Sequence, residues 1–239
     1  MKHLLTIIIL LTIGTLSVMA QPRLRHAEMY VGVHGGVEAT MNYWLPKVEG
    51  TDQLLNTVLL GGNGGIRFRY IKHKYFGWQV ELNYLQRGWR EKVSATALNE
   101  GGTYTRRLHY LELPFLMHLY FGKRRWRGFF NLGPEIGYCI KESHSGVQHP
   151  SQTEQYKSLD HPFDWGVAGG AGFYYRNKKA GTFELEARFM FSLGDMFDNS
   201  KRAYFDQSHS MVLSLNLAYM WEFTSKDKVR KQKKGTDKL

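Results

Sequence analysis

The sequence is poor in cysteine, in proline and in long apolar runs. Its single cysteine, Cys139, cannot form a disulfide within the chain, which excludes a disulfide-stapled scaffold. No segment after Ala20 is apolar over the roughly 18 residues that a membrane-spanning helix needs, so any membrane span of the mature chain must consist of strands. Hydrophobic residues make up 43% of the chain, which excludes global disorder. The 25 glycines and 14% aromatic residues are typical of strands and turns rather than of a helical bundle.

The N-terminus predicts export from the cytoplasm. A short polar start is followed by an apolar run at residues 4–13, and Val18 and Ala20 stand at the third and the last position before a cleavage site. We therefore expect residues 1–20 to be a secretory signal peptide. The next residue is Gln21 rather than cysteine, which excludes a lipoprotein anchor. An uncleaved N-terminal anchor is the alternative interpretation.

Apolar and polar residues alternate along much of the mature chain. In 182–194 the residues Phe183, Leu185 and Phe189 fall on one face, and Glu184 and Glu186 fall on the other. A period of two residues predicts a strand with one apolar and one polar face. Eight segments show this pattern or are compatible with it, and they are 28–38, 58–72, 76–88, 103–121, 127–141, 163–175, 182–194 and 208–223.

The connections between these segments alternate strictly in length. Those at 39–57, 89–102, 142–162 and 195–207 are long, whereas those at 73–75, 122–126 and 176–181 are short. This alternation is typical of outer-membrane barrels, which have long external loops and tight periplasmic turns. The sequence therefore predicts an all-β protein, an eight-stranded antiparallel transmembrane β-barrel over residues 21–223, followed by a basic periplasmic tail at 224–239. A soluble β-sandwich or lipocalin-like barrel is the alternative, and it would bury the apolar face.

A barrel with lipid-facing apolar residues turns its polar faces to the lumen. An eight-stranded barrel is just wide enough to be filled by its own side chains, so we expect the charged lumen residues to form an internal plug of salt bridges and hydrogen bonds. The alternative is a selective conduit for a small solute. Cys139 faces the lumen in this register as an inert filler. The predicted lumen network comprises Arg67, Arg69, Glu81, Glu112, Glu135, Glu184, Glu186 and Arg188.

No motif in the chain predicts catalysis or metal binding. Among the ten histidines, His144, His149 and His161 share one predicted loop, but their spacing matches no standard zinc pattern. A lipid-modifying hydrolase would need serine and histidine on one wall, whereas His209 and Ser210 are adjacent and point to opposite faces of a strand. We therefore expect no catalytic residues, no metal and no cofactor.

Positive charge is concentrated in the predicted short turns and in the C-terminal tail. The turns and their flanks contain no acidic residue, whereas the predicted long loops are mildly acidic. The turns and the tail would together form a basic rim around the periplasmic end of the barrel, and such a rim can steer and orient an acidic protein partner. Alternatively, its charge only keeps the turns from crossing the membrane and attracts anionic headgroups. Nucleic acid is no sensible partner in this compartment. The predicted basic rim comprises Lys72, Lys74, Lys123, Arg124, Arg125, Arg127, Arg176, Lys178, Lys179, Lys231, Lys233 and Lys234.

Three short motifs resemble a known family. The segments 78–84 (WQVELNY), 110–114 (YLELP) and 133–138 (GPEIGY) are similar to the small outer-membrane β-barrel family of Bacteroidetes, which includes components of the type IX (Por) secretion system. Glu81, Glu112 and Glu135 match motif positions of this family, and we interpret them as lumen residues. The resemblance supplies no catalytic residues.

The resemblance implies a non-enzymatic outer-membrane protein embedded in the lipid bilayer. It also implies a role in the export and maturation of cargo that carries a C-terminal sorting domain, such as secreted proteases. Its partners would be other secretion-system proteins on the periplasmic side, and no small-molecule substrate is expected. A passive porin-like or structural barrel is the main alternative, and a lipid-modifying outer-membrane hydrolase is the other.

Overall fold

A computed structural model describes residues 23–46, 56–93, 102–123, 125–146, 159, 161–177, 180–194 and 205–223. These residues form strands joined by short connections. The strands are β1 (Arg23–Pro46), β2 (Asn56–Thr57), β3 (Leu59–His73), β4 (Phe76–Val93), β5 (Gly102–Lys123), β6 (Trp126–Gly146), β7 (Phe163–Asn177), β8 (Gly181–Ser192) and β9 (Phe205–Glu222). No helix among the described residues is long and apolar enough to cross a membrane.

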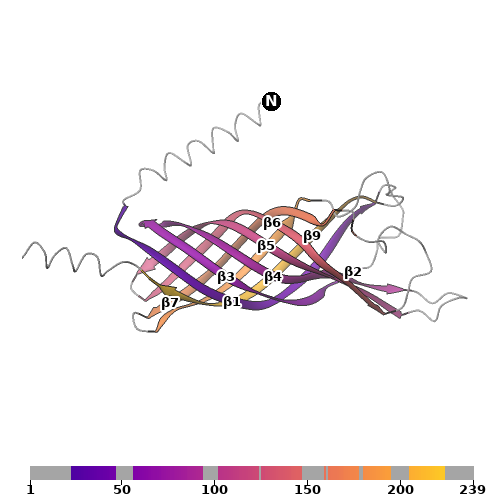
Figure 1. Cartoon of the computed structure of the whole chain (residues 1–239), viewed down its shortest axis with the longest axis horizontal. Helices are drawn as coiled ribbons and strands as arrows, with labels where there is room; N and C mark the ends of the chain where they lie inside the picture. The colour runs from indigo at the N-terminus through magenta and orange to yellow at the C-terminus, as the bar shows by residue number, and fades with distance from the viewer. Residues whose placement is uncertain are drawn as a thin grey trace, which may run out of the picture.

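The strands close into a single antiparallel barrel (Figure 1). Each long strand pairs with its neighbours in sequence, and β1 also pairs with β9, which joins the first strand to the last. The two-residue strand β2 extends the edge of β4 through Asn56 and Thr57 and is not part of the closed wall. The prediction of an eight-stranded antiparallel barrel is therefore confirmed.

The barrel has two different ends. The turn end carries the connections β3–β4, β5–β6 and β7–β8, which are only a few residues long. The loop end is where β1 finishes at Pro46 and β9 begins at Phe205. At the loop end the strands are longer than predicted, since residues 39–46, 89–93 and 142–146 belong to strands rather than to loops. The hydrophobic alternation fades there although backbone pairing continues, for example between Tyr43 and His209, so the sequence pattern underestimates the strands.

The outer face of the barrel wall is apolar and its inner face is polar, which is the reverse of a soluble protein. On β8 and β9 the side chains of Phe189 and Leu217 are 47% and 66% exposed, whereas Glu186 and Asn216 are only 1% and 3% exposed. The alternative of a soluble sandwich is therefore wrong, because such a fold would bury the phenylalanine and expose the glutamate. Near the turn end, outward aromatic residues pack on each other, as Trp78 does on Phe115 with ring centroids 5.1 Å apart.

One turn depends on a glycine that no other residue replaces well. Gly181 opens β8 with φ of +87°, a conformation that side chains with a Cβ rarely adopt. A Cβ at this position would also lie 2.8 Å from the Tyr219 hydroxyl oxygen on β9. The β7–β8 turn is therefore specified by backbone geometry and by close packing against the neighbouring strand.

Candidate functional site

Six charged side chains fill the middle of the barrel. We call this set the central network, and it consists of Arg67, Arg69, Glu81, Glu184, Glu186 and Arg188. The Arg67 guanidinium contacts three carboxylates, with Nε 2.8 Å from Glu81, Nη1 2.9 Å from Glu184 and Nη2 2.7 Å from Glu186. Arg188 joins Glu81 at 2.7 Å and Glu186 at 2.9 Å, and Arg69 pairs with Glu184. Three guanidinium groups thus face three carboxylates, and the formal charge of the central network is zero.

Neutral side chains complete the hydrogen bonds of the central network. Gln79 accepts from Arg69 Nε at 2.6 Å and donates to Glu81, while Asn131 donates to Glu186 Oε1 at 2.7 Å. Because the Asn131 amide nitrogen is used in this way, its oxygen accepts the Nδ1–H of His118 at 2.7 Å. Buried charges are tolerated when they are paired and hydrogen-bonded, and these neighbours provide that support.

The central network does not border a channel. Arg67, Glu81 and Glu186 are each only 1% exposed, although they lie on the inner wall of the barrel. Side chains that lined a water-filled passage would be exposed to it. At this level of the barrel the described side chains therefore fill the interior.

A second cluster lies closer to the loop end and has a different charge balance. Arg87 on β4 pairs with Glu112, with Glu135 at 3.0 Å and with Asp164 at 2.9 Å. One guanidinium group thus faces three carboxylates that come from β5, β6 and β7. The ring of Tyr110 lies 5.0 Å from the Arg87 guanidinium carbon, which adds a cation–π contact.

Glu38 adds a fourth carboxylate to this region. Its side chain is 2% exposed and accepts hydrogen bonds only from neutral groups, the Gln86 amide at 3.0 Å and the Asn63 side chain at 3.4 Å. Within the described part of the chain no cationic side chain lies within ion-pair distance of Glu38. This carboxylate therefore has no ion-pair partner among the described residues.

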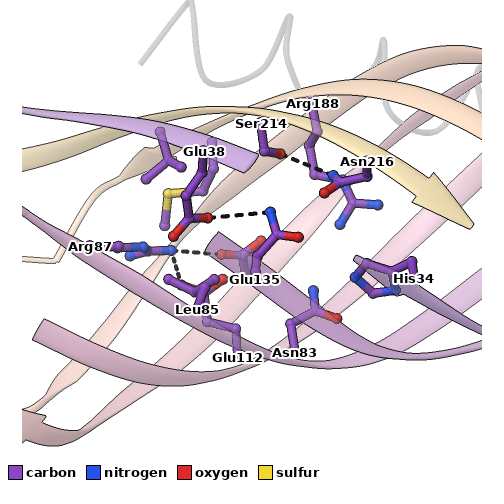
Figure 2. Close-up of a pocket in the computed structure, with 13 residues that line it drawn as sticks. His34, Glu38, Asn83, Leu85, Arg87, Glu112, Glu135, Arg188, Ser214 and Asn216 are labelled. Carbon is purple, nitrogen blue, oxygen red and sulfur yellow. Dashed lines mark hydrogen bonds and ion pairs between the residues drawn. The ribbon is translucent and has the colours of Figure 1, made fainter. Parts of the chain in front are cut away.

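A small cavity separates the two clusters (Figure 2). Its volume is about 30 Å³, and Glu38, Arg87 and Glu135 are among its lining residues, with Arg87 joined to Glu135 by a dashed line in Figure 2. We call it the acidic cavity. Its other lining side chains include His34, Asn83, Glu112, Arg188, Ser214 and Asn216.

The turn end holds a third group of charges, which we call the turn-end cluster. Arg176 lies 3.0 Å from Glu28 on β1 and 2.6 Å from Glu222 on β9, and Arg127 lies 3.7 Å from Glu28. The Tyr30 hydroxyl donates to Glu28 at 2.8 Å. Two arginines of the predicted basic rim are thus paired with carboxylates at the ends of the first and last strands.

Three other rim residues point outward. Lys72, Lys74 and Arg125 are exposed, and among the described residues no carboxylate lies within ion-pair distance of them. Lys74 lies over the ring of Tyr75 at 5.1 Å. The backbone of Lys123 is in β5, and Arg124, Lys178, Lys179, Lys231, Lys233 and Lys234 lie outside the described residues, as do the predicted signal peptide and tail.

Several residues of these clusters are not among the lumen residues predicted from the sequence. All eight predicted lumen residues are buried, but Glu38, Arg87 and Asp164 were not among them. The sequence does indicate their orientation. Arg87 lies six residues after Glu81 on β4, and Glu38 lies four residues after His34 on β1, and an even spacing places two residues on the same face of a strand. Glu38, Arg87 and Asp164 lie inside the predicted strand segments 28–38, 76–88 and 163–175, so the alternation within those segments already places them on the inner face.

The described residues offer no arrangement typical of catalysis or of direct metal binding. Ser210 faces the interior and donates to Asn42 at 3.0 Å, whereas His209 packs against the outward ring of Phe191. No group of three or more His, Cys, Asp or Glu side chains in the described part of the chain could by itself hold a metal ion.

Comparison with known proteins identifies the family. The sequence matches the family described as "Outer membrane protein beta-barrel domain" over residues 19–198. The chain belongs to this family. It is thus an outer-membrane β-barrel protein, and its lipid-facing surface is the apolar wall described above. No curated protein matches its sequence.

Several solved outer-membrane barrels are similar to this one in fold. OprG from Pseudomonas aeruginosa is 16% identical, with 82% of this chain and 97% of OprG covered and a TM-score of 0.48. Outer membrane protein W of E. coli is 15% identical, with 83% and 100% covered and a TM-score of 0.39. Neisserial surface protein A is 11% identical, with 81% and 97% covered and a TM-score of 0.40.

Proposed function

We propose that this outer-membrane barrel is a non-catalytic component of a protein secretion system of the type IX (Por) kind. In this proposal its turn end faces the periplasm and binds an acidic surface of another secretion-system protein. The barrel would be needed for export and maturation of cargo with a C-terminal sorting domain, such as secreted proteases. The motifs at 78–84, 110–114 and 133–138 support it, because they resemble the PorT component of that system.

The observation that carries the proposal is the unpaired positive charge at the turn end. The only described acidic residues there, Glu28 and Glu222, are half-buried and engaged by Arg127 and Arg176. The remaining cations Lys72, Lys74 and Arg125 are free to contact a partner. A surface of one sign raises the association rate and orients a partner of the opposite sign.

The filled interior favours docking over passive transport. A porin-like barrel remains compatible with membership of the family, but it would need a water-filled passage. The central network leaves no such passage among the described side chains, since the side chains of Arg67 and Glu184 are not exposed at all. A role at the surface of the barrel therefore agrees better with the structure than a role in its lumen.

The first test is the secretome of a strain that lacks the gene. We expect sorting-domain cargo to disappear from the culture supernatant and to accumulate in the periplasm, and the wild-type gene should restore its export. Mass spectrometry of both fractions measures this. An unchanged secretome would refute the secretion role and leave a passive barrel, to be examined next by single-channel conductance in planar bilayers.

The second test addresses the docking surface. The variant Lys72→Glu/Lys74→Glu/Arg125→Glu should insert normally, as judged by heat-modifiable mobility on gels, but should fail to restore export. A matched control reverses three exposed cations nearer the loop end, Arg90→Glu/Arg107→Glu/Lys141→Glu, and should export cargo normally. Normal export by the turn-end variant would remove the docking role while leaving the secretion role intact.

A further inference from the structure

The acidic cavity carries more negative charge than the protein compensates. Four buried carboxylates lie in or beside it, and among the described residues that line it Arg87 is the only arginine that is not already bound to the central network. Arg188 also borders the cavity, but both of its terminal nitrogens are held by Glu81 and Glu186. The four carboxylates are those of Glu38, Glu112, Glu135 and Asp164. Isolated buried charges are costly, so this region takes up further positive charge, either a proton or a bound cation.

Uncharged oxygen atoms also lack partners beside the cavity. Asn83 is 5% exposed, and its amide nitrogen donates to Glu81 Oε2 at 3.1 Å, which fixes the orientation of the amide. Its oxygen therefore stays on the other side, where it has no hydrogen-bond partner. The Asn216 oxygen, on a side chain 3% exposed, is likewise without a partner. Both residues line the cavity.

We propose that the acidic cavity binds a hard cation of the Ca²⁺ or Mg²⁺ type. Such ions prefer carboxylate and amide oxygens and fill the rest of their shell with water. Glu38, Glu135 and Asn83, whose oxygen has no hydrogen-bond partner, all line the cavity, and its volume of about 30 Å³ has room for an ion with one or two waters. The described His, Cys, Asp and Glu side chains do not chelate a metal by themselves, so the retained water and the amide oxygens are part of the site.

The site is independent of the proposed secretion role. It lies inside the barrel wall, whereas the docking surface lies at the turn end. An ion that binds the folded barrel but not the unfolded chain raises the free energy of unfolding. Once the free ion concentration exceeds the dissociation constant, this rise grows with the logarithm of the concentration. The test is therefore made on the purified full-length barrel in detergent micelles, with no cargo or partner present.

Thermal unfolding in EDTA, CaCl₂ and MgCl₂, at ionic strength held constant with choline chloride, tests the site. We expect the melting temperature of the wild type to rise with the concentration of a divalent cation and to fall to its lowest value in EDTA. In Glu38→Gln the buried charge is lost, the new amide oxygen can accept from the Gln86 N–H, and the new NH₂ group can donate to the Asn63 oxygen, which has no partner in the wild type, once the Asn63 amide turns over. This variant should melt higher than the wild type in EDTA, and should lose the response to divalent cations.

Isothermal titration calorimetry with CaCl₂ then counts the sites. One site should be present in the wild type and in the control Glu28→Gln at the turn end, and absent from Glu38→Gln. If Glu38→Gln does not fold, Glu135→Gln replaces it, with weakened binding expected. A wild type that neither binds nor responds would overturn the proposal, because a bound proton would then neutralise Glu38. A site that survives in Glu38→Gln would also overturn it, since the ion would lie elsewhere.

Discussion

The substitution Glu186→Gln tests the central network most directly. Glu186 Oε2 accepts from Arg67 at 2.7 Å and from Arg188 at 2.9 Å, while Oε1 accepts from Asn131 at 2.7 Å. All groups that surround this carboxylate are donors. A glutamine amide would therefore point its NH₂ group at a donor in either orientation, and the network would carry one uncompensated positive charge.

The expected cost is large because the site is dry. Glu186 and Arg67 are each 1% exposed, so water cannot replace the lost pairing. Removing one partner of a buried ion pair costs about 3–5 kcal/mol, and we expect Glu186→Gln to fall in this range. The alternation of the sequence alone suggests the opposite, a mild effect for a polar substitution on a polar face. The hydrogen bonds and ion pairs of the Glu186 carboxylate are the reason to expect the larger loss of stability.

Equilibrium unfolding in urea from phospholipid vesicles measures the free energy. The double variant Arg67→Gln/Glu186→Gln restores the charge balance, because two arginines and two glutamates remain. It should be more stable than the sum of the two single variants predicts, by about 0.5–3 kcal/mol. A cost below about 1 kcal/mol for Glu186→Gln, with no coupling to Arg67, would refute the reasoning and indicate that water reaches the network.

Two further predictions concern the wall of the barrel. Phe189→Arg places a charge on the lipid-facing surface and should cost about 2–4 kcal/mol near the middle of the bilayer in the same urea assay, whereas Phe189→Leu should cost much less. Similar costs for the two would mean that this face does not contact lipid. Gly181→Ala should destabilise the barrel by roughly 1–2 kcal/mol because φ is +87° there and the Tyr219 hydroxyl lies 2.8 Å from the new Cβ. Gly169→Ala, whose Cβ would lie 3.6 Å or more from its neighbours, is the control, and an equal loss in both would refute the argument from backbone strain.

The sequence predicts whether a side chain points into the barrel or out of it, but it does not predict which side chains form ion pairs across the lumen. A pleated strand alternates its side chains, so the period of two in 182–194 places Glu184, Glu186 and Arg188 inside without further information. Which residues meet across the lumen depends on the register of strands that lie far apart in the chain. Arg67 reaches Glu184 and Glu186 across 117 and 119 residues of sequence, and no local pattern encodes that distance.

The charge of the turn end also depends on barrel closure. The charged residues of the short turns and their flanks are all basic, because Glu28 and Glu222 belong to the first and last strands. Barrel closure brings these two strands together, with Tyr30 paired to Glu222, and so places both carboxylates beside Arg176. The basic rim is thus smaller at its described surface than the sequence suggested, and it is carried by Lys72, Lys74 and Arg125.

The balance of charge changes along the axis of the barrel, from basic at the turn end through neutral in the middle to acidic nearer the loop end. The turn-end cluster pairs its inward arginines and leaves the outward lysines available to a partner. The central network is neutral and dry, so it separates the turn end from the rest of the lumen. The acidic cavity beyond it is the one described place where the interior is short of positive charge. The proposed ion would stabilise the wall that β1, β4, β5 and β6 share, and the proposed docking surface lies apart from it at the turn end. The filled, ion-paired middle agrees with the proposed docking role, since a conduit would need a water-filled passage there.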